Sequence, residues 1–483
     1  MGDEVLSPGL RIAKNAAYLL VSDVGVRFIS AVVAILVARY LGPEQYGVLS
    51  VALALLGIAA YLTDLGVTPV MIREGTKPGA DLSQLLSGTL RLRLLFAVVT
   101  TLIMGLVAWF YYPSATVRLV ILAVVLPGIW AGVFRGIATG YFQMVQEMQY
   151  VALINAVAAV AGAAMFLLAV VGRWSLPALS LGYGLSAVVG AALGMLLVRR
   201  QVPIGRGGHP RLMTGLPAFA LGGALGLLLP QLGPLLLPHV ATLEETGFFT
   251  AASRIPSALL ALPGVIATAF YPQLFAYGNT DPGKHRDLSG REVRLMGTVG
   301  LLMAIPLSFY AGGIARVVFG TAWAERSGSA LTLLGMGFGL CCLSWPLADA
   351  LTTQGLQARR VGVQGLAVVV GAGAYWVFGA RWGAWGAALA ALTVEAVLLG
   401  GFLFANPCAG ELLREGVGPV ALKALLLVAL AGGVRWAVGS GWVGLGLTVA
   451  LTGGAVLVKE QKMRGWGGMG VGLVRKWCRG RGG

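Results

Sequence analysis

The sequence predicts an all-α integral membrane protein with about fourteen transmembrane helices, arranged as two six-helix bundles around a central cavity plus two C-terminal helices. Hydrophobic residues make up 57% of the 483 residues and charged residues only 11%, whereas a soluble chain carries about 25% charge. Charges are scarce because each one is costly in hydrocarbon. This composition excludes a soluble fold. Basic loops facing anionic lipid explain the net charge of +16 without any binding to nucleic acid.

Fourteen stretches are long and apolar enough for a crossing, which needs about 20 residues. The first exceeds the short apolar core of a cleavable signal peptide, so we expect it to stay as a membrane anchor. Pro217, Pro230, Pro234 and Pro238 interrupt the seventh stretch and predict kinks there, which are candidate hinges. The predicted spans are 15–39, 47–65, 84–111, 117–141, 150–171, 176–198, 213–238, 246–276, 292–318, 328–351, 361–379, 383–405, 418–438 and 442–458.

The distribution of basic residues predicts the orientation. With the N-terminus inside, the two tails, the even-numbered loops and the helix ends facing them hold 25 Lys and Arg residues, and the opposite side holds seven. Short cytoplasmic loops accumulate such residues. We therefore expect a multi-pass protein of the cell's inner (cytoplasmic) membrane with cytoplasmic N- and C-termini. The seven residues on the outer side are Arg39, Arg118, Arg173, Arg316, Arg326, Arg381 and Arg435.

Similar segments 200 residues apart indicate a duplication. The segment "PEQYGVLSVA" (43–52) aligns with "LEETGFFTAA" (243–252), and "RLRLLFAVVT" (91–100) aligns with "REVRLMGTVG" (291–300). Because each half contains six helices, an even number, both halves begin on the same side of the membrane, as in parallel transporter repeats. Two such bundles across a cavity are typical of alternating access. The predicted units are an N-terminal six-helix bundle (1–200), a cytoplasmic linker (201–212), a C-terminal six-helix bundle (213–405), two additional helices (406–458) and a basic cytoplasmic tail (459–483).

Three stretches carry a resemblance to a known family. The segments "ARYLGPEQYGVLSVALAL" (38–55), "TDLGVTPVMIRE" (63–74) and "GFFTAASRIPSALLALPGVIATAFYPQL" (247–274) resemble polysaccharide or O-antigen flippases of the multidrug/oligosaccharidyl-lipid/polysaccharide (MOP) exporter superfamily. The resemblance covers residues 10 to 280. It implies a flippase that moves a polyprenyl-pyrophosphate-linked oligosaccharide from the cytoplasmic to the outer leaflet for cell-surface polysaccharide synthesis. The implied partners are this lipid-linked oligosaccharide, membrane lipids, and a polysaccharide polymerase or glycosyltransferases.

Three arginines inside predicted spans are the candidate substrate-binding residues: Arg27, Arg135 and Arg254. A guanidinium at membrane depth needs an anionic partner or a wet cavity, and its planar fork holds a pyrophosphate with paired hydrogen bonds. The similarity of "GVRF" (25–28) and "AASRIP" (251–256) to the arginine segments of lipid II flippases also points to Arg27 and Arg254. The alternatives are an intrahelical pair of Arg27 with Asp23 and a position of Arg135 near a helix end, where its charge would reach the interface.

Four carboxylates in or near spans are candidates for ion coupling: Asp23, Asp64, Asp349 and Glu395. A buried carboxyl group can carry a proton or, when ionised, bind Na⁺. Asp64 also fits a simple polar group at a helix end, and Glu395 faces either the bundle interior or a lipid groove. We expect no cofactor and no metal site, because the four cysteines show no metal-ligand spacing.

An enzyme is the competing class. A polytopic glycan polymerase or ligase also meets lipid-linked sugars, but the outer loops are short and the sequence contains no catalytic Gly-x-Ser-x-Gly, His-Glu-x-x-His or Gly-Lys-Ser/Thr motif. We therefore expect no enzymatic activity. Within the superfamily, a multidrug or ion antiporter and a lipid II flippase are the alternatives. A positively charged cavity would favour a flippase, and a negatively charged cavity an extruder of cationic drugs.

Overall fold

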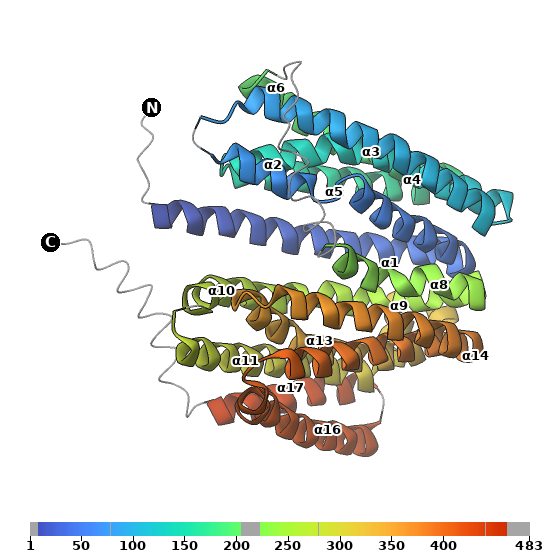
Figure 1. The fold of residues 1–483 in the computed structure, drawn as a ribbon. Coiled ribbons are helices and arrows are strands. Elements are labelled where there is room, and N and C mark those ends of the chain that lie inside the picture. Colours follow the sequence, from blue (N-terminus) through green and yellow to red (C-terminus); the bar gives the residue numbers. More distant parts are fainter. Residues whose placement is uncertain (1–7, 78, 204–222, 279, 440, 461–483) are drawn as a thin grey trace, which may run out of the picture.

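The computed structural model describes residues 8–77, 79–203, 223–278, 280–439 and 441–460. Within these ranges every regular element is a helix. The helices lie roughly side by side in two stacked halves, and the first helix begins on the side where the last one ends (Figure 1). The predicted all-α membrane fold is therefore confirmed.

The N-terminal half forms the upper layer in Figure 1. Its long helices are apolar along most of their length, and short polar corners join them. Its elements are α1 (Pro8–Leu62), α2 (Val67–Gly75), α3 (Leu82–Tyr111), α4 (Ala115–Met144), α5 (Met148–Val171) and α6 (Leu176–Gln201).

The C-terminal half forms the lower layer, and the last helices lie along its outer edge (Figure 1). Its elements are η2 (Leu229–Gln231), α8 (Leu232–Val240), α9 (Leu243–Leu259), α10 (Ala261–Gly278), α11 (Pro282–Phe309), α12 (Ala311–Phe319), η3 (Thr321–Trp323), α13 (Arg326–Thr353) and α14 (Gln357–Ala405). The additional helices are α15 (Ala409–Glu411), η4 (Leu412–Val417), α16 (Gly418–Val438) and α17 (Trp442–Glu460).

Single glycines divide two of the longest helices. Gly42 in α1 has φ 74° and ψ 173°, and Gly383 in α14 has φ 55°. Glycine adopts positive φ without the penalty that a Cβ would impose. Pro43 follows Gly42 and suits the first turn of a new helix, where no backbone N–H is needed. Each of these helices therefore contains two crossings joined by a sharp bend.

The number of crossings is consistent with the prediction of about fourteen. Ten helices of the described residues are long and apolar enough to cross a membrane, and α9 with α10 forms a further crossing that is bent by 40°. The two bends in α1 and α14 each divide one long helix into two crossings. The short apolar helix Trp442–Gly453, within α17, lies where the fourteenth span was predicted.

Several predicted boundaries were wrong. The loop expected at 40–46 is reduced to the bend at Gly42, and the eighth span is divided between α9 and α10. The ninth span begins at Pro282 and not at 292, because Asp281 caps α11 by accepting a hydrogen bond from the Lys284 amide at 3.0 Å. The first turns of α11 carry charged residues, so they lie outside the apolar stretch from which the span was predicted. Most of the predicted linker and tail lies outside the described residues.

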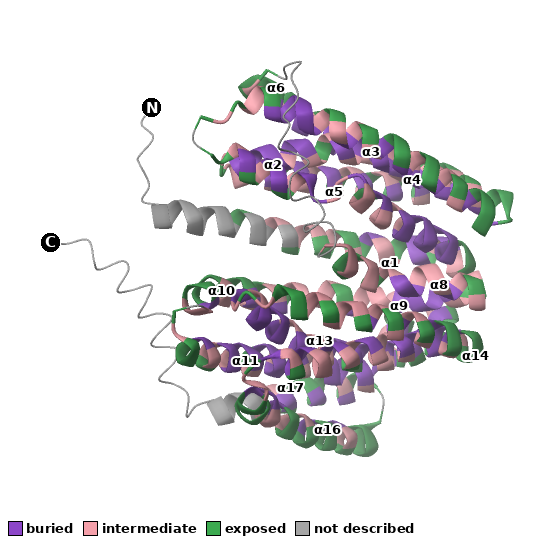
Figure 2. Cartoon of the chain, viewed as in Figure 1, coloured by how far each residue is buried: buried purple, intermediate pink, exposed green. Residues whose placement is uncertain are grey.

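Buried residues gather where helices of the same half meet and where the two halves touch (Figure 2). The outward faces carry large apolar side chains that are well exposed, such as Phe110 on α3, Leu425 on α16 and Trp436 on α16. In water such an apolar surface would favour aggregation. These faces suit contact with lipid, as expected of a multi-pass membrane protein.

The two halves meet where α1 passes α9. A Cβ on Gly47 would lie 1.9 Å from the carbonyl oxygen of Leu243, and a Cβ on Gly247 would lie 1.9 Å from that of Pro43. Only glycine allows this backbone approach. The two contacts are related by an offset of 200 residues, which is the offset of the predicted repeat.

Candidate functional site

A cavity of about 630 Å³ lies between α1, α4, α5, α6 and α9. Small and aliphatic side chains of α1 and α5 form much of its wall. No carboxylate is among the described residues that line it, and its charged members are Arg135 and Arg254. Its neutral polar and aromatic members are Ser22, Ser30, Tyr46, Asn155, Phe166 and Tyr183.

Arg254 reaches the cavity from α9 and is the only lining residue from the C-terminal half among those described. Its Nε donates a hydrogen bond to the hydroxyl oxygen of Tyr46 on α1 at 3.3 Å. Tyr46 is almost fully buried and its ring packs edge-on against Trp323, with centroids 6.1 Å apart. The arginine is thus oriented by a rigid side chain of the opposite half, and this bond uses one of the five N–H groups of its guanidinium.

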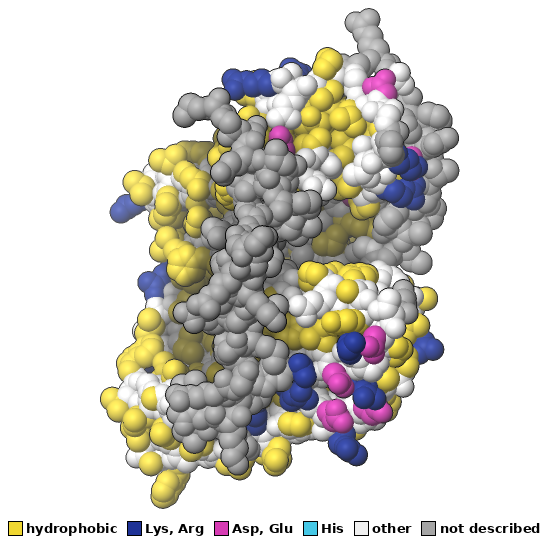
Figure 3. Space-filling view, turned by 90° about the vertical axis from the view of Figure 1, so that its left-hand side faces the viewer, with side chains coloured by type: hydrophobic (Ala, Val, Ile, Leu, Met, Phe, Trp, Pro, Cys, Tyr) yellow, Lys and Arg dark blue, Asp and Glu magenta, His cyan; other side chains and the backbone are white. Residues whose placement is uncertain are grey.

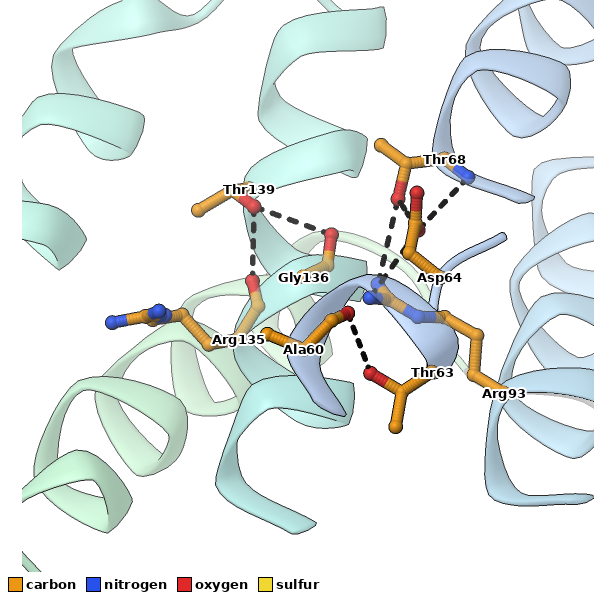
Figure 4. Close-up of polar contacts among 8 residues, drawn as sticks. All are labelled: Ala60, Thr63, Asp64, Thr68, Arg93, Arg135, Gly136 and Thr139. Carbon is orange, nitrogen blue, oxygen red and sulfur yellow. Dashed lines mark hydrogen bonds and ion pairs between the residues drawn. The ribbon is translucent and has the colours of Figure 1, made fainter. Parts of the chain in front are cut away.

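Arg135 reaches the same cavity from α4 in the N-terminal half. In Figure 4 its guanidinium points away from Asp64 and Arg93, which lie on the other side of α4. Thr139 bonds back to the carbonyl oxygens of Arg135 and Gly136 at 3.1 and 3.2 Å. The structure therefore brings two of the three predicted arginines, Arg135 and Arg254, to one cavity from the two halves.

A buried ion pair supports α4 behind Arg135. Arg93 on α3 is 5% exposed, and its Nη2 lies 3.3 Å from Oδ1 of Asp64. Its guanidinium rests on Gly136, where a Cβ would lie 2.0 Å from Nη1. Asp64 also caps α2 by accepting a hydrogen bond from the backbone N–H of Thr68 at 3.2 Å (Figure 4).

The third predicted arginine, Arg27, is exposed, and its side chain does not line the cavity. Its predecessor Val26 does line it, so Arg27 lies on α1 at the level of the cavity but on another face. The side chain of Asp23 lies outside the described residues. The alternative of an Arg27–Asp23 pair therefore stays a prediction.

The other predicted carboxylates lie in the C-terminal half and away from the cavity. Asp349 on α13 is buried, with Oδ1 3.8 Å from Nη1 of Arg360 on α14. Glu395 on α14 accepts a hydrogen bond from Ser344 of α13 at 3.4 Å. Glu395 therefore faces another helix of its bundle. Roles for Asp23, Asp64, Asp349 and Glu395 in coupling stay predictions.

Sequence reasoning missed the neutral polar residues of the cavity. Asn155 stands alone in the apolar stretch "VALINAVAAV" (151–160), and an amide in mid-span is itself a signal of a polar environment. Tyr46 was part of the specific corner motif but was not assigned to a site. Its role depends on the pairing of segments 208 residues apart, which the local pattern does not reveal.

Polar contacts between the halves close one end of the interface. Arg39 donates to the carbonyl oxygens of Val317 and Val318, the latter at 2.6 Å. Within the C-terminal half, Arg326 pairs with Glu245 at 2.8 Å beside the same contact. Figure 3 shows the opposite side of the molecule, where recessed apolar side chains are visible along parts of the boundary between the halves. The described polar contacts between the two halves lie near the bend of α1.

A family model described as "Polysaccharide biosynthesis protein" matches residues 12–277, more than half of the chain. The chain belongs to this family. Its fold is similar to that of the lipid II flippase MurJ in an inward closed conformation, with a TM-score of 0.75, 10% identity, and coverage of 92% of this chain and 98% of that chain. No curated protein matches the sequence.

Further similar structures are transporters. An inward-facing multidrug resistance MATE transporter of the MOP superfamily has a TM-score of 0.65 and 14% identity over 80% of this chain and 96% of that chain. A MOP superfamily transporter from Pyrococcus furiosus, described as having a binding pocket of reverse polarity, has a TM-score of 0.60 and 16% identity over 82% of this chain and 96% of that chain. The polysaccharide family recognised from sequence is confirmed, and the fold is similar to that of transporters of the MOP superfamily.

Proposed function

We propose that this membrane protein is a flippase that moves a polyprenyl-pyrophosphate-linked oligosaccharide from the cytoplasmic to the outer leaflet by alternating access, for cell-surface polysaccharide synthesis. The observation that carries the proposal is the polarity of the cavity. Arg135 and Arg254 enter it from the two halves, and no carboxylate is among its described lining residues. Membership in the polysaccharide biosynthesis family supports the same substrate class.

The two arginines suit a pyrophosphate better than a single anionic group. A guanidinium stays charged at any relevant pH and donates two parallel hydrogen bonds to phosphate oxygens. A pyrophosphate offers oxygens to both Arg135 and Arg254 at once, and so binds the two halves together. Neutral polar groups such as Asn155 and Tyr183 are then available to sugar hydroxyls. The lipid chain would extend into the surrounding bilayer.

The closed contact between α1 and α9 supports a movement of the two halves. Its backbone approach at Gly47 and Gly247 is tight, and its polar contacts among the described residues, such as Ser50–Thr250 and Tyr46–Arg254, are single hydrogen bonds between neutral groups or to one arginine. Opening it while the opposite side closes would expose the arginines to the other leaflet, which is the alternating-access scheme of parallel repeats. We propose coupling of this movement to H⁺ or Na⁺, through Asp23, Asp64, Asp349 or Glu395.

The alternative functions differ in the charge of the cavity that their substrates require. An extruder of cationic drugs would be expected to hold carboxylates in its cavity, in contrast to Arg135 and Arg254. For the similar transporter from Pyrococcus furiosus, a binding pocket of reverse polarity is described as suggesting a different function. A lipid II flippase shares the pyrophosphate and remains the second candidate, favoured by the fold of MurJ. The fold favours a transporter over a glycan polymerase or ligase, because it is similar to the folds of a flippase and of multidrug transporters.

The test is a leaflet-accessibility assay in liposomes. Purified protein is reconstituted with one labelled polyprenyl-pyrophosphate monosaccharide, with lipid II, or with an encapsulated cationic dye. We expect rapid equilibration of the pyrophosphate-linked sugar between leaflets and no transport of the dye. Faster flipping of lipid II than of the simple sugar lipid would favour the second candidate. Dye transport without lipid flipping would refute the proposal.

A further inference from the structure

A carboxyl group in the C-terminal half is buried without a hydrogen-bond partner among the described residues. Glu292 on α11 is 0% exposed, and neither of its carboxylate oxygens has such a partner. One turn earlier on the same helix, the hydroxyl of Ser289 is also buried and without a partner there. Two neighbouring polar groups that are both buried and unsatisfied are costly unless they serve a purpose.

These groups lie on one face of α11, which packs against α13. His285, Ser289 and Glu292 stand at i, i+4 and i+7 and so share one face of α11. The ring Nε2 of His285 lies 2.8 Å from Thr353 Oγ1 on α13, and its Nδ1 lies 3.4 Å from the amide nitrogen of Gln354. The row of polar groups therefore begins near the start of α11.

The antiparallel packing of α11 on α13 places an acidic residue opposite Glu292. A Cβ on Gly300 would lie 2.5 Å from Cβ of Cys342, and His285 meets Thr353. Between these two contacts the register brings Asp349 towards Glu292 and Ser289. We call the set of His285, Ser289, Glu292, Asp349 and Thr353 the α11–α13 seam.

Three charged groups around the seam have partners other than Glu292. Arg360 on α14 lies 3.8 Å from Asp349, and Lys423 on α16 donates to Thr298 at 3.1 Å. Arg294 on α11 donates to the carbonyl oxygen of Glu415 in η4. Tyr271 on α10 is the further titratable group close to Asp349. None of them has a hydrogen bond or ion pair with Glu292 among the described contacts.

We propose that Glu292 binds the coupling proton of this transporter, and that the α11–α13 seam is the path by which the proton reaches it. This inference rests on the proposed flippase function, which it deepens by naming the ion, and it assigns the proton to Glu292 in place of the four carboxylates considered from the sequence. An ionised carboxylate in this position would lose its hydration and gain no donor, whereas the neutral acid loses far less. The proton passes from water to a Glu292 oxygen in this conformation and returns to water when the seam rearranges.

The seam does not suit a sodium ion. Hard cations require several oxygen ligands arranged around one point. The described residues contain no group of three or more His, Cys, Asp or Glu side chains that could hold a metal ion. The nearest second carboxylate, on Asp349, already lies beside the Arg360 guanidinium.

The first test reads the proton directly and needs no substrate. Infrared difference spectra of the purified protein in nanodiscs, taken on a pH change, should show a protonated carboxyl band that is absent from Glu292→Gln. The matched control Glu74→Gln removes another buried carboxylate, which is held by Lys77 and Arg73, and should keep the band. Persistence of the band in Glu292→Gln, or a response to Na⁺ and not to pH, would overturn the proposal.

The second test measures coupling in liposomes with a proton gradient. The unchanged protein should accumulate flipped lipid beyond equilibrium, and Glu292→Gln should only equilibrate it. Accumulation by Glu292→Gln equal to that of the unchanged protein overturns the proposal. If Glu292→Gln folds poorly, His285→Gln should slow the spectral response to pH without removing the band, and an unchanged response contradicts the path. A spectral response without any lipid flipping would refute the flippase function alone.

Discussion

The side chains of Ser50 and Thr250, 200 residues apart, meet in the buried interface between the two halves, with Oγ and Oγ1 2.9 Å apart. Each hydroxyl oxygen also lies within hydrogen-bonding distance of the carbonyl oxygen four residues earlier, on Tyr46 and on Thr246. The two residues therefore occupy equivalent places in their helices. This relationship makes the α1–α9 contact a symmetric closure, and it leads to the first prediction.

A side chain at Gly47 should open the closure. A Cβ there would lie 1.9 Å from a backbone carbonyl oxygen, and overpacking of this kind costs about 1–3 kcal/mol. We expect Gly47→Ala to lower the population of the closed state. Spin labels at Glu44→Cys and Glu244→Cys should report a loss of the short distance. The control is Gly105→Ala, since a Cβ on Gly105 has no neighbour within 4 Å. An unchanged distance distribution in Gly47→Ala would contradict the closure.

The Tyr46 hydroxyl should contribute modestly to transport by orienting Arg254. Tyr46→Phe keeps the ring packing against Trp323 but removes the acceptor of the 3.3 Å hydrogen bond. A hydrogen bond to a charged group contributes about 1.5–3 kcal/mol, so we expect roughly a tenfold or greater loss of flipping rate. Tyr111→Phe, which changes an exposed ring on α3, is the control. Equal rates for the two variants would argue against orientation by Tyr46.

The Arg93–Asp64 pair should stabilise the N-terminal half. Removing one partner of a buried pair leaves a charge uncompensated and costs about 3–5 kcal/mol. We expect Asp64→Asn to lower the thermal unfolding temperature in detergent more than Arg73→Gln, which affects a largely exposed side chain. The double variant Asp64→Leu/Arg93→Met should recover part of the loss. Full activity and stability of Asp64→Asn would leave this pair without a structural role.

The predicted orientation can be tested by labelling in intact cells. A cysteine at Ser114, between α3 and α4, should react with an impermeant reagent from outside, because the basic residues gather on the other side. A cysteine at Lys284, at the start of α11, should react only after the cells are opened. Both positions are exposed. Labelling of Lys284→Cys from outside would reverse the orientation.

The sequence predicted the membrane class and the approximate number of crossings because hydropathy is a local signal. It predicted the offset of 200 residues because the segments around Gly47 and Gly247 resemble each other in sequence. It predicted the three arginines as candidate site residues because a charged side chain inside a membrane span needs an anionic partner or a wet cavity. It did not predict that Arg135, and not Arg27, shares the cavity with Arg254, since rotation of a helix about its axis depends on tertiary packing. Glu292 was missed because its charged neighbours, Arg291 and Arg294, made the start of α11 look like a solvated helix end.

The measurement that tests the central claim most directly is the flipping rate of a polyprenyl-pyrophosphate sugar by Arg254→Ala and Arg254→Lys at matched protein density in liposomes. The control, Arg381→Ala, changes an exposed arginine outside the cavity. We expect flipping to be lost in Arg254→Ala, partly restored in Arg254→Lys, because ammonium keeps the charge without the bidentate geometry, and unchanged in Arg381→Ala. Undiminished flipping by a correctly inserted Arg254→Ala protein would contradict the claim that this cavity binds the pyrophosphate.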